Sequence, residues 1–119
     1  MAYFDDLTGL LNRNWYALNK SKINKKWVYF IDINNLHNIN SKGHSVGDEY
    51  IKRIVGIIKN KLKKNDLFIR YGGDEFLIFS DEKNLIKDEE LYSVGYCEIK
   101  ENIEEAINYA DHKMLSNKR

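Results

Sequence analysis

Two acidic residues stand side by side in the segment RYGGDEFLIF, residues 70–79. Asp74 and Glu75 follow two glycines and precede an apolar run that is typical of a buried strand. A third acid, Asp32, lies near the end of an earlier apolar run. If the two runs are neighbouring strands, these carboxylates meet at one edge of a sheet. Together with a backbone carbonyl such as that of Ile33, they are oxygen ligands that suit Mg²⁺ or Mn²⁺ rather than zinc.

Carboxylates held this close repel one another unless a cation neutralises them. Divalent ions bound there can stabilise the attacking and the leaving oxygen of a phosphoryl transfer. The alternative interpretation is that Asp74 and Glu75 are polar residues of a hairpin turn. Gly72 and Gly73 fit both interpretations, because they permit a positive φ and a close approach of a ligand, and a type I′ turn uses glycines equally well.

The segment from residue 34 to residue 50 is dense in side chains that form hydrogen bonds. Within it, the Asn40 amide and the Asp48 carboxylate can together bind the donor and acceptor edge of a purine. The alternative, which residue types alone favour, is that these residues form turns and helix caps, as Ser45 does in that interpretation.

The hydrophobic pattern predicts the elements that must position these residues. Helices are predicted at about 10–22, 45–63 and 102–116, and strands at 26–33, 67–71, 76–79 and 91–99. Leu18 is expected on the buried side of the first helix and Val46 on that of the second. This order predicts an α+β fold with a mainly antiparallel sheet and helices on one or both of its faces.

Length and composition limit the class of protein. A chain of 119 residues predicts a single domain over residues 1–119. With 19 basic and 18 acidic residues, binding to long nucleic acids is not expected. Cys97 is the only cysteine, which fits a reducing cytoplasm. No apolar stretch approaches the roughly 20 residues that cross a bilayer, so we expect a cytoplasmic protein without membrane contact.

Several stretches, in order along the chain, resemble the GGDEF domain family of diguanylate cyclases. They are DDLTGLLNR, FIDINNLHNIN, GHSVGDEY and RYGGDEF, and the later stretches SVGYCEI and YADHKMLSNK resemble the end of that domain. The resemblance implies a palm-like, ferredoxin-like fold. It also implies the condensation of two GTP molecules into cyclic di-GMP with release of pyrophosphate. Each chain binds one GTP, so a homodimer brings each 3′-hydroxyl to the α-phosphate of the other GTP.

The resemblance also implies roles for individual residues. Asp32, Asp74 and the Ile33 carbonyl would bind Mg²⁺ or Mn²⁺, and Glu75 would lie close to the metals as a catalytic residue. The other residues that it implies in substrate binding are Asn40 and Asp48 for guanine, Leu36, His37 and Lys118 for phosphates, and Gly72 and Gly73 at the backbone.

The chain also departs from the family pattern. Asn34 stands where the family often has a second Asp, and Leu36-His37 replaces a Phe-Lys pair. Lys63 replaces the arginine of the usual product-inhibition motif and cannot form its bidentate fork, so product inhibition is not expected. Arg119 is the candidate for a further phosphate-binding arginine.

The charged stretch DEKNLIKDEE, residues 81–90, stands where the family inserts a helix. The absence of that helix is expected to expose part of one sheet face, which a second copy or a partner protein would cover. Two other functions remain open: a related palm cyclase that uses another nucleotide such as ATP, and a non-catalytic GTP-binding or interaction module.

Overall fold

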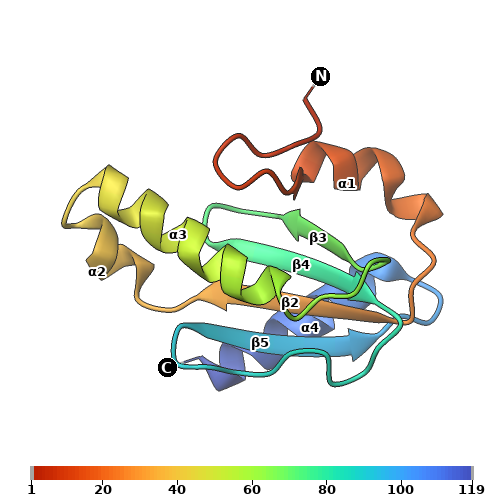
Figure 1. Ribbon diagram of the computed structural model, residues 1–119. Coiled ribbons are helices and arrows are strands. Elements are labelled where there is room, and N and C mark those ends of the chain that lie inside the picture. Colours follow the sequence, from red (N-terminus) through yellow and green to blue (C-terminus); the bar gives the residue numbers. More distant parts are fainter. Residues whose placement is uncertain (1, 119) are drawn as a thin grey trace.

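A five-stranded sheet with helices on both faces forms the fold in the computed structural model, which describes residues 2–118 (Figure 1). Along the chain the elements are β1 (Leu11–Asn12), α1 (Arg13–Asn19), the 3₁₀ turn η1 (Lys20–Lys22), β2 (Trp27–Ile33), α2 (Leu36–Asn40), α3 (His44–Lys59), β3 (Leu67–Arg70), β4 (Glu75–Ser80), β5 (Tyr92–Glu98) and α4 (Ile103–Asn117). The strand order is β1-β3-β4-β2-β5, and only β1 and β3 are parallel among the described neighbours. The predicted α+β fold with a mainly antiparallel sheet is confirmed.

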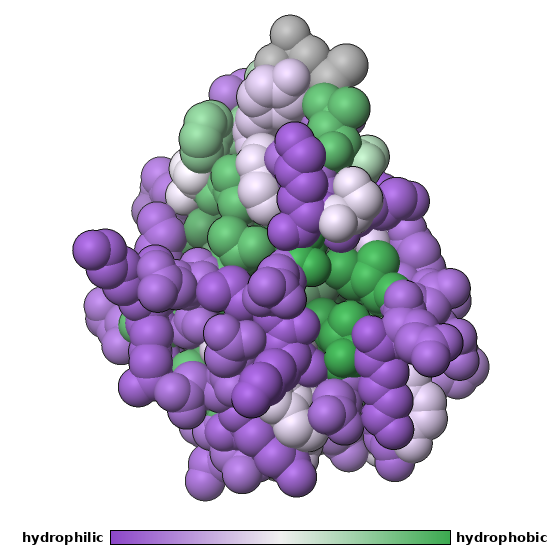
Figure 2. Space-filling view, turned by 90° about the vertical axis from the view of Figure 1, so that its right-hand side faces the viewer, coloured by the Kyte–Doolittle hydropathy of each residue, from purple (hydrophilic) through white to green (hydrophobic). Residues whose placement is uncertain are grey.

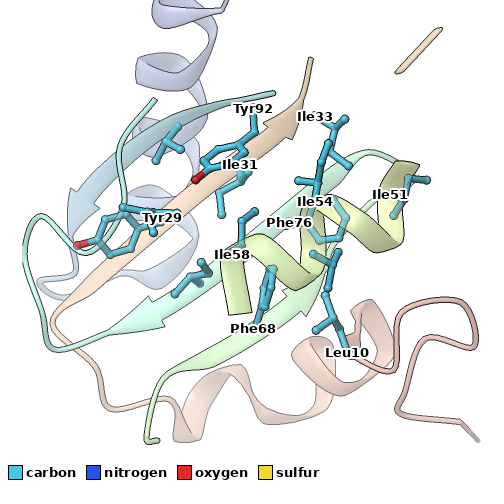
Figure 3. Packing of buried hydrophobic residues seen from close by; sticks show 14 of the residues in the cluster. Leu10, Tyr29, Ile31, Ile33, Ile51, Ile54, Ile58, Phe68, Phe76 and Tyr92 are labelled. Atoms are coloured by element: carbon cyan, nitrogen blue, oxygen red, sulfur yellow. The ribbon is translucent and has the colours of Figure 1, made fainter. Parts of the chain in front are cut away.

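Strand β2 lies inside the sheet, between β4 and β5, and it is buried on both faces. Tyr29 and Ile31 face α3, where Figure 3 shows them in one cluster with Ile54 and Ile58. The intervening Phe30 belongs to a second cluster on the opposite face. A strand buried on both faces reads as a continuous apolar run, which is why the sequence pattern predicted it.

Helix α4 covers the second face, where Ala106, Ala110 and Met114 are buried. A side chain at Gly95 of β5 would overlap the backbone of α4 at Ala110 and Met114. The glycine therefore lets the helix lie directly on the strand. This close packing holds the C-terminal end of α4 near the end of β2.

The first helix begins later than predicted. Leu11 belongs to β1 and pairs with Ile69, and the Asn12 side chain caps α1 by accepting a hydrogen bond from the Trp15 amide at 2.9 Å. The buried side of α1 is consequently different, because Tyr16 is buried and Leu18 is 56% exposed. The expectation for Leu18 is wrong.

Helix α3 ends at Lys59 rather than near residue 63. The chain turns there, and the Lys63 amide donates to the Asp66 carboxylate at 2.8 Å. Val46 is 43% exposed, contrary to expectation, because the first turn of α3 extends past the sheet beside α2 (Figure 1). Ser45 lies inside α3 and Gly43 is the N-cap residue, so the prediction of a Ser45 cap is also wrong.

The connection between β4 and β5 contains no helix, as predicted, yet it covers the sheet. Ile86 is buried in the cluster between α3 and the sheet. The Tyr29 hydroxyl donates to the Glu82 carbonyl and accepts from the Leu85 amide at 3.1 Å, and Tyr29 is fully buried. The expectation of an exposed apolar face is therefore wrong at this position, because the irregular segment packs where a helix would.

Figure 2 shows a mostly hydrophilic face that surrounds a narrow band of apolar residues. Among residues 2–118, no helix is both long enough and apolar enough to cross a membrane. Arg119 lies outside the described residues.

Candidate active site

The pairing of β2 with β4 brings the predicted acidic residues together. Asp32 lies opposite Glu75 in the antiparallel register. The Ile33 amide donates to the Asp74 carbonyl at 3.1 Å, which fixes the signature loop to the end of β2. The predicted convergence of Asp32, Asp74 and Glu75 at one sheet edge is confirmed, and their roles as ligands or catalysts stay predictions.

Asp32 has an unusual electrostatic environment. The residue as a whole is 8% exposed, and one oxygen, Oδ2, lies 3.1 Å from the Lys118 ammonium. Within residues 2–118, the other oxygen, Oδ1, is buried and has no hydrogen-bond partner. Burial raises the pKa of Asp32 to about 6, with a further contribution from the charge of Asp74. An unpaired buried oxygen beside a second carboxylate is a position that a cation would stabilise.

The donor set is compatible with Mg²⁺ or Mn²⁺. Among residues 2–118, no group of three or more His, Cys, Asp and Glu side chains lies close enough together to hold a metal ion. The protein ligands would therefore be the two aspartates Asp32 and Asp74 and the Ile33 carbonyl. Mg²⁺ is commonly bound by only one or two carboxylates together with water and substrate phosphates, so this small set fits the ion.

Glu75 lies at the start of β4 and folds back over the signature loop. A side chain at Gly72 would meet its Oε1 at 2.6 Å, so Gly72 makes room for this carboxylate. Burial raises the pKa of Glu75, and the charges of Asp74 and then of Asp111 add to the effect. Asp111 belongs to α4, and sequence reasoning did not connect it with this edge.

The signature loop is not a type I′ turn. Positive φ angles within residues 2–118 occur at Gly9, Gly43 and two asparagines, but not at Gly72 or Gly73. The expectation of a positive φ in this loop is therefore wrong. Gly73 instead offers its carbonyl to Arg70, whose Nη2 donates at 2.7 Å and Nε at 3.2 Å.

Arg70 also ties the loop to the N-terminal segment. Its Nη1 lies 3.1 Å from both carboxylate oxygens of Asp5. Although burial tends to raise the pKa of Asp5, hydrogen bonds from Thr8 and the charge of Arg70 outweigh it and lower that pKa. Sequence reasoning assigned Asp5 and Arg70 no role. Their signals were the Asp-x-x-Thr pattern of a side-chain turn and an arginine two residues before the first glycine.

A cavity of about 380 Å³ adjoins Asp74, whereas Asp32 and Glu75 do not line it. It is lined by Leu36, His37, Asn40, His44, Asp48, Ile51, Arg70, Gly73 and Asp74. The structure thus gathers most predicted substrate-binding residues around one space. Gly72 and Lys118 do not line it, and His44, Ile51 and Arg70 are lining residues that sequence reasoning missed.

Helices α2 and α3 arrange this lining. Asn35 has a left-handed backbone with φ of 67°, and it starts α2 inside what the sequence predicted to be a loop. Leu36 is buried in the core, which anchors α2 to the sheet. Asp48 lies in α3 beyond its cap, so the interpretation of Asp48 as a helix cap is wrong.

Comparison with known proteins identifies the family. Residues 2–94 match the family model for the diguanylate cyclase GGDEF domain. The chain belongs to the GGDEF family. YtrP of Bacillus subtilis is 30% identical over 97% of this chain and 24% of its own length. Diguanylate cyclase DgcS of Shewanella oneidensis is 34% identical over 65% of this chain and 29% of its own length.

This GGDEF chain thus spans less than a third of the length of these relatives. Another relative is the cyclic di-GMP phosphodiesterase NbdA of Pseudomonas aeruginosa, 34% identical over 77% of this chain and 12% of its own length. Relatives with a GGDEF match therefore carry the names of both cyclases and phosphodiesterases.

Solved structures agree on the fold. The GGDEF domain of DgcB from Caulobacter crescentus, in complex with c-di-GMP, has a TM-score of 0.79 at 22% identity, with 98% of this chain and 90% of that chain covered. The diguanylate cyclase SiaD from Pseudomonas aeruginosa, in complex with its activator SiaC, has a TM-score of 0.78 at 21% identity and covers 98% of this chain and 58% of that chain. At these identities the likeness establishes the GGDEF palm fold.

Proposed function

We propose that this GGDEF chain is a diguanylate cyclase that condenses two GTP molecules into cyclic di-GMP and releases pyrophosphate. The observation that carries the proposal is that Asp32 and Asp74 lie together at one end of the sheet, where Asp74 also lines a cavity with Asn40 and Asp48. Metal-binding carboxylates and a base-binding pair are the two components that selective nucleotidyl transfer requires. Family membership supports the same function.

Asp32, Asp74 and the Ile33 carbonyl would hold the divalent ion. A bound Mg²⁺ or Mn²⁺ would activate the 3′-hydroxyl and stabilise the charge that develops at the α-phosphate. As an ion binds Asp32, its positive charge would repel the Lys118 ammonium and favour the loss of that contact. The released ammonium can then bind a phosphate oxygen, as a compact charge on a flexible stem.

The cavity would bind the rest of GTP. An Asp48 carboxylate can accept hydrogen bonds from two guanine N–H groups while the Asn40 amide both donates and accepts. The first amides of α2, at Leu36 and His37, have no partner inside the helix and are available to phosphate oxygens. Gly72 and Gly73 would keep the loop backbone accessible to the substrate.

One cavity per chain binds one GTP, so catalysis requires two chains face to face. The segment between β4 and β5 already covers the sheet face, which removes the reason for a permanent partner there. We therefore propose a homodimer that forms through the bound nucleotides. Light scattering should show more dimer with a GTP analogue than without it.

The decisive experiment incubates the protein with equimolar GTP, ATP, CTP and UTP and either Mg²⁺ or Mn²⁺, and identifies products by mass spectrometry. Cyclic di-GMP alone is expected. Asp74→Ala should abolish it with an unchanged melting temperature. Glu101→Ala, an exposed change before α4, is the matched control and should remain active. A cyclic product made from ATP would identify the alternative palm cyclase instead.

A second candidate is a module that binds GTP without turnover. The contact of Lys118 with Asp32 favours it, because an ammonium already neutralises the predicted metal ligand. Asn34, which replaces a family aspartate, is buried and bonded to Ser93 at 2.8 Å, so it adds no negative charge to the site. Calorimetry that shows GTP binding, together with no product in the incubation, would support this candidate over the cyclase.

A further inference from the structure

Gly47 is buried in the second turn of α3, where Asn40 covers it. A side chain at Gly47 would overlap the Oδ1 atom of Asn40 and lie 3.0 Å from its Cγ. The same side chain would lie 3.7 Å from the Asn40 Cα, which is ordinary van der Waals contact. The glycine therefore makes room for the amide of Asn40 and not for the backbone of α2.

Helix geometry gives no other reason for a glycine here. Gly47 has a helical backbone and not the positive φ that favours glycine. Glycine is the least favourable helix residue after proline. The same helix contains Gly56, and a side chain there would meet nothing within 4 Å. The two glycines differ in that only Gly47 has a polar side chain lying on it.

The place of Asn40 has a chemical consequence. Gly47 precedes Asp48, and Asn40 and Asp48 line the same cavity. The Asn40 amide, whose oxygen lies against Gly47, and the Asp48 carboxylate are thus two polar groups that this cavity would offer to a base. The Asp48 carboxylate requires a base with two neighbouring N–H donors, as guanine has at N1 and N2, whereas adenine has an acceptor at N1.

We propose that Gly47 is a positioning residue that sets selectivity for guanine by making room for the Asn40 amide next to Asp48. This inference rests on the proposed function, since it assigns the cavity to a guanine nucleotide. It depends on one steric relationship, between residue 47 and the Asn40 amide. An added methyl group at residue 47 must rotate the Asn40 amide away while α2 and α3 stay in place.

The test is a double-mutant cycle with Gly47→Ala and Asn40→Ala, with Gly56→Ala as the matched control. Affinities for the α,β-methylene analogues of GTP and ATP are measured by calorimetry with Mg²⁺. Gly47→Ala should lower the affinity for the GTP analogue about tenfold, which is the effect of one lost hydrogen bond. It should change the affinity for the ATP analogue less than about twofold. Gly56→Ala should change neither affinity. In the Asn40→Ala background, Gly47→Ala should have no further effect.

An equal loss for both nucleotides, or the same loss in the Asn40→Ala background, would show that Gly47 serves general packing and would overturn the proposal. Circular dichroism should show unchanged helix content for Gly47→Ala. If that variant unfolds, the comparison of Asn40→Ala with the double variant still decides, because truncated Asn40 leaves room for the methyl group.

A wild-type protein without preference for the GTP analogue would contradict the proposed function. Nuclear magnetic resonance can then test separately whether the Asn40 side chain lies on Gly47. Cross-peaks between the Asn40 side-chain amide protons and the Gly47 α protons are expected in the free protein. Their absence would overturn the steric relationship itself.

Discussion

The Lys118 ammonium lies 3.1 Å from Oδ2 of Asp32, and this contact joins the end of the last helix to the end of the central strand. The Lys118 side chain is 31% exposed, so it can move into solvent, whereas that of Asp32 is 12% exposed and held in the sheet. A divalent ion and Lys118 therefore compete for one carboxylate. The first prediction follows from this competition.

Replacement of Lys118 by glutamine should strengthen Mn²⁺ binding in the absence of nucleotide, because Asp32 loses its internal cation. An increase in affinity of about tenfold corresponds to about 1.4 kcal/mol. Melting temperatures measured across a Mn²⁺ titration report this binding, since a ligand of the folded state raises stability. Lys113→Gln on the same helix is the control and should behave as wild type.

Asp32 should reduce stability near neutral pH. Its pKa is raised from 3.8 to about 6, so the folded state holds a proton over a range in which the unfolded chain has lost it. The stabilisation that comes from holding this proton is fully present below pH 3.8 and is lost as the pH rises through about 6. Asp32→Asn should therefore stabilise the protein at pH 7.5 by on the order of 2–3 kcal/mol.

Urea unfolding with EDTA present, at pH 4 and at pH 7.5, measures this difference. The advantage of Asp32→Asn should shrink at the lower pH, and Asp6→Asn, a change at an exposed residue, should show none. A constant advantage at both pH values would mean that packing and not ionisation is responsible.

The Asp5–Arg70 ion pair should stabilise both the fold and the site. The two side chains are 19% and 17% exposed, and Arg70 also holds the Gly73 carbonyl. Arg70→Lys keeps the charge but loses the planar guanidinium, whose Nη1 holds Asp5 while its Nη2 and Nε hold the Gly73 carbonyl, and we expect a loss of about 1–3 kcal/mol in the free energy of unfolding. Lys20→Met, which breaks an exposed pair with Glu104, should cost less than about 1 kcal/mol.

The stability that the Asp5–Arg70 ion pair contributes depends on pH with the opposite sign to the effect of Asp32. Because the pKa of Asp5 is lowered, its stabilisation is present above the ordinary value of 3.8 and is lost as the pH falls through the lowered value. The difference in stability between wild type and Asp5→Asn should accordingly be full at pH 7 and narrow in acid. Chemical unfolding over a pH series tests it, and a gap that stays constant into acid would contradict it.

The Tyr29 hydroxyl should hold the segment between β4 and β5 on the sheet. Tyr29→Phe leaves the Glu82 carbonyl and the Leu85 amide without their partner, at an expected cost of about 1–3 kcal/mol. Hydrogen exchange at the Leu85 amide should become faster while exchange in β2 stays slow. Tyr96→Phe, at a residue 37% exposed, is the control, and equal effects of the two changes would contradict this role.

Much of the fold could be predicted because local chemistry fixes it. The apolar run of β2 could only be a strand buried on both faces. The helix predicted at 102–116 is present as α4, and its residues Ala106, Ala110 and Met114, which recur at helical spacing, are buried. The convergence of Asp32 and Asp74 followed from two strands that end at the same edge.

Other features depended on contacts between distant residues. The pairing of Leu11 with Ile69 decides which side of α1 is buried, and Leu18 is exposed as a result. No local sequence pattern predicts this pairing. The segment 81–90 looked like an uncovered gap because its charges dominate its composition. Ile86 and the Tyr29 hydroxyl hold it on the core.

The sequence by itself determined strands β2 to β5, helices α1, α3 and α4, and the types of the acidic and polar residues at their ends, because hydrophobic periodicity and turn chemistry act over a few residues. Tertiary structure alone decided that Lys118 reaches Asp32, that Arg70 joins Asp5 to the signature loop, and that Asn40 lies on Gly47. These pairs are separated along the chain, and only the packing of the helices on the sheet brings their atoms within reach of one another.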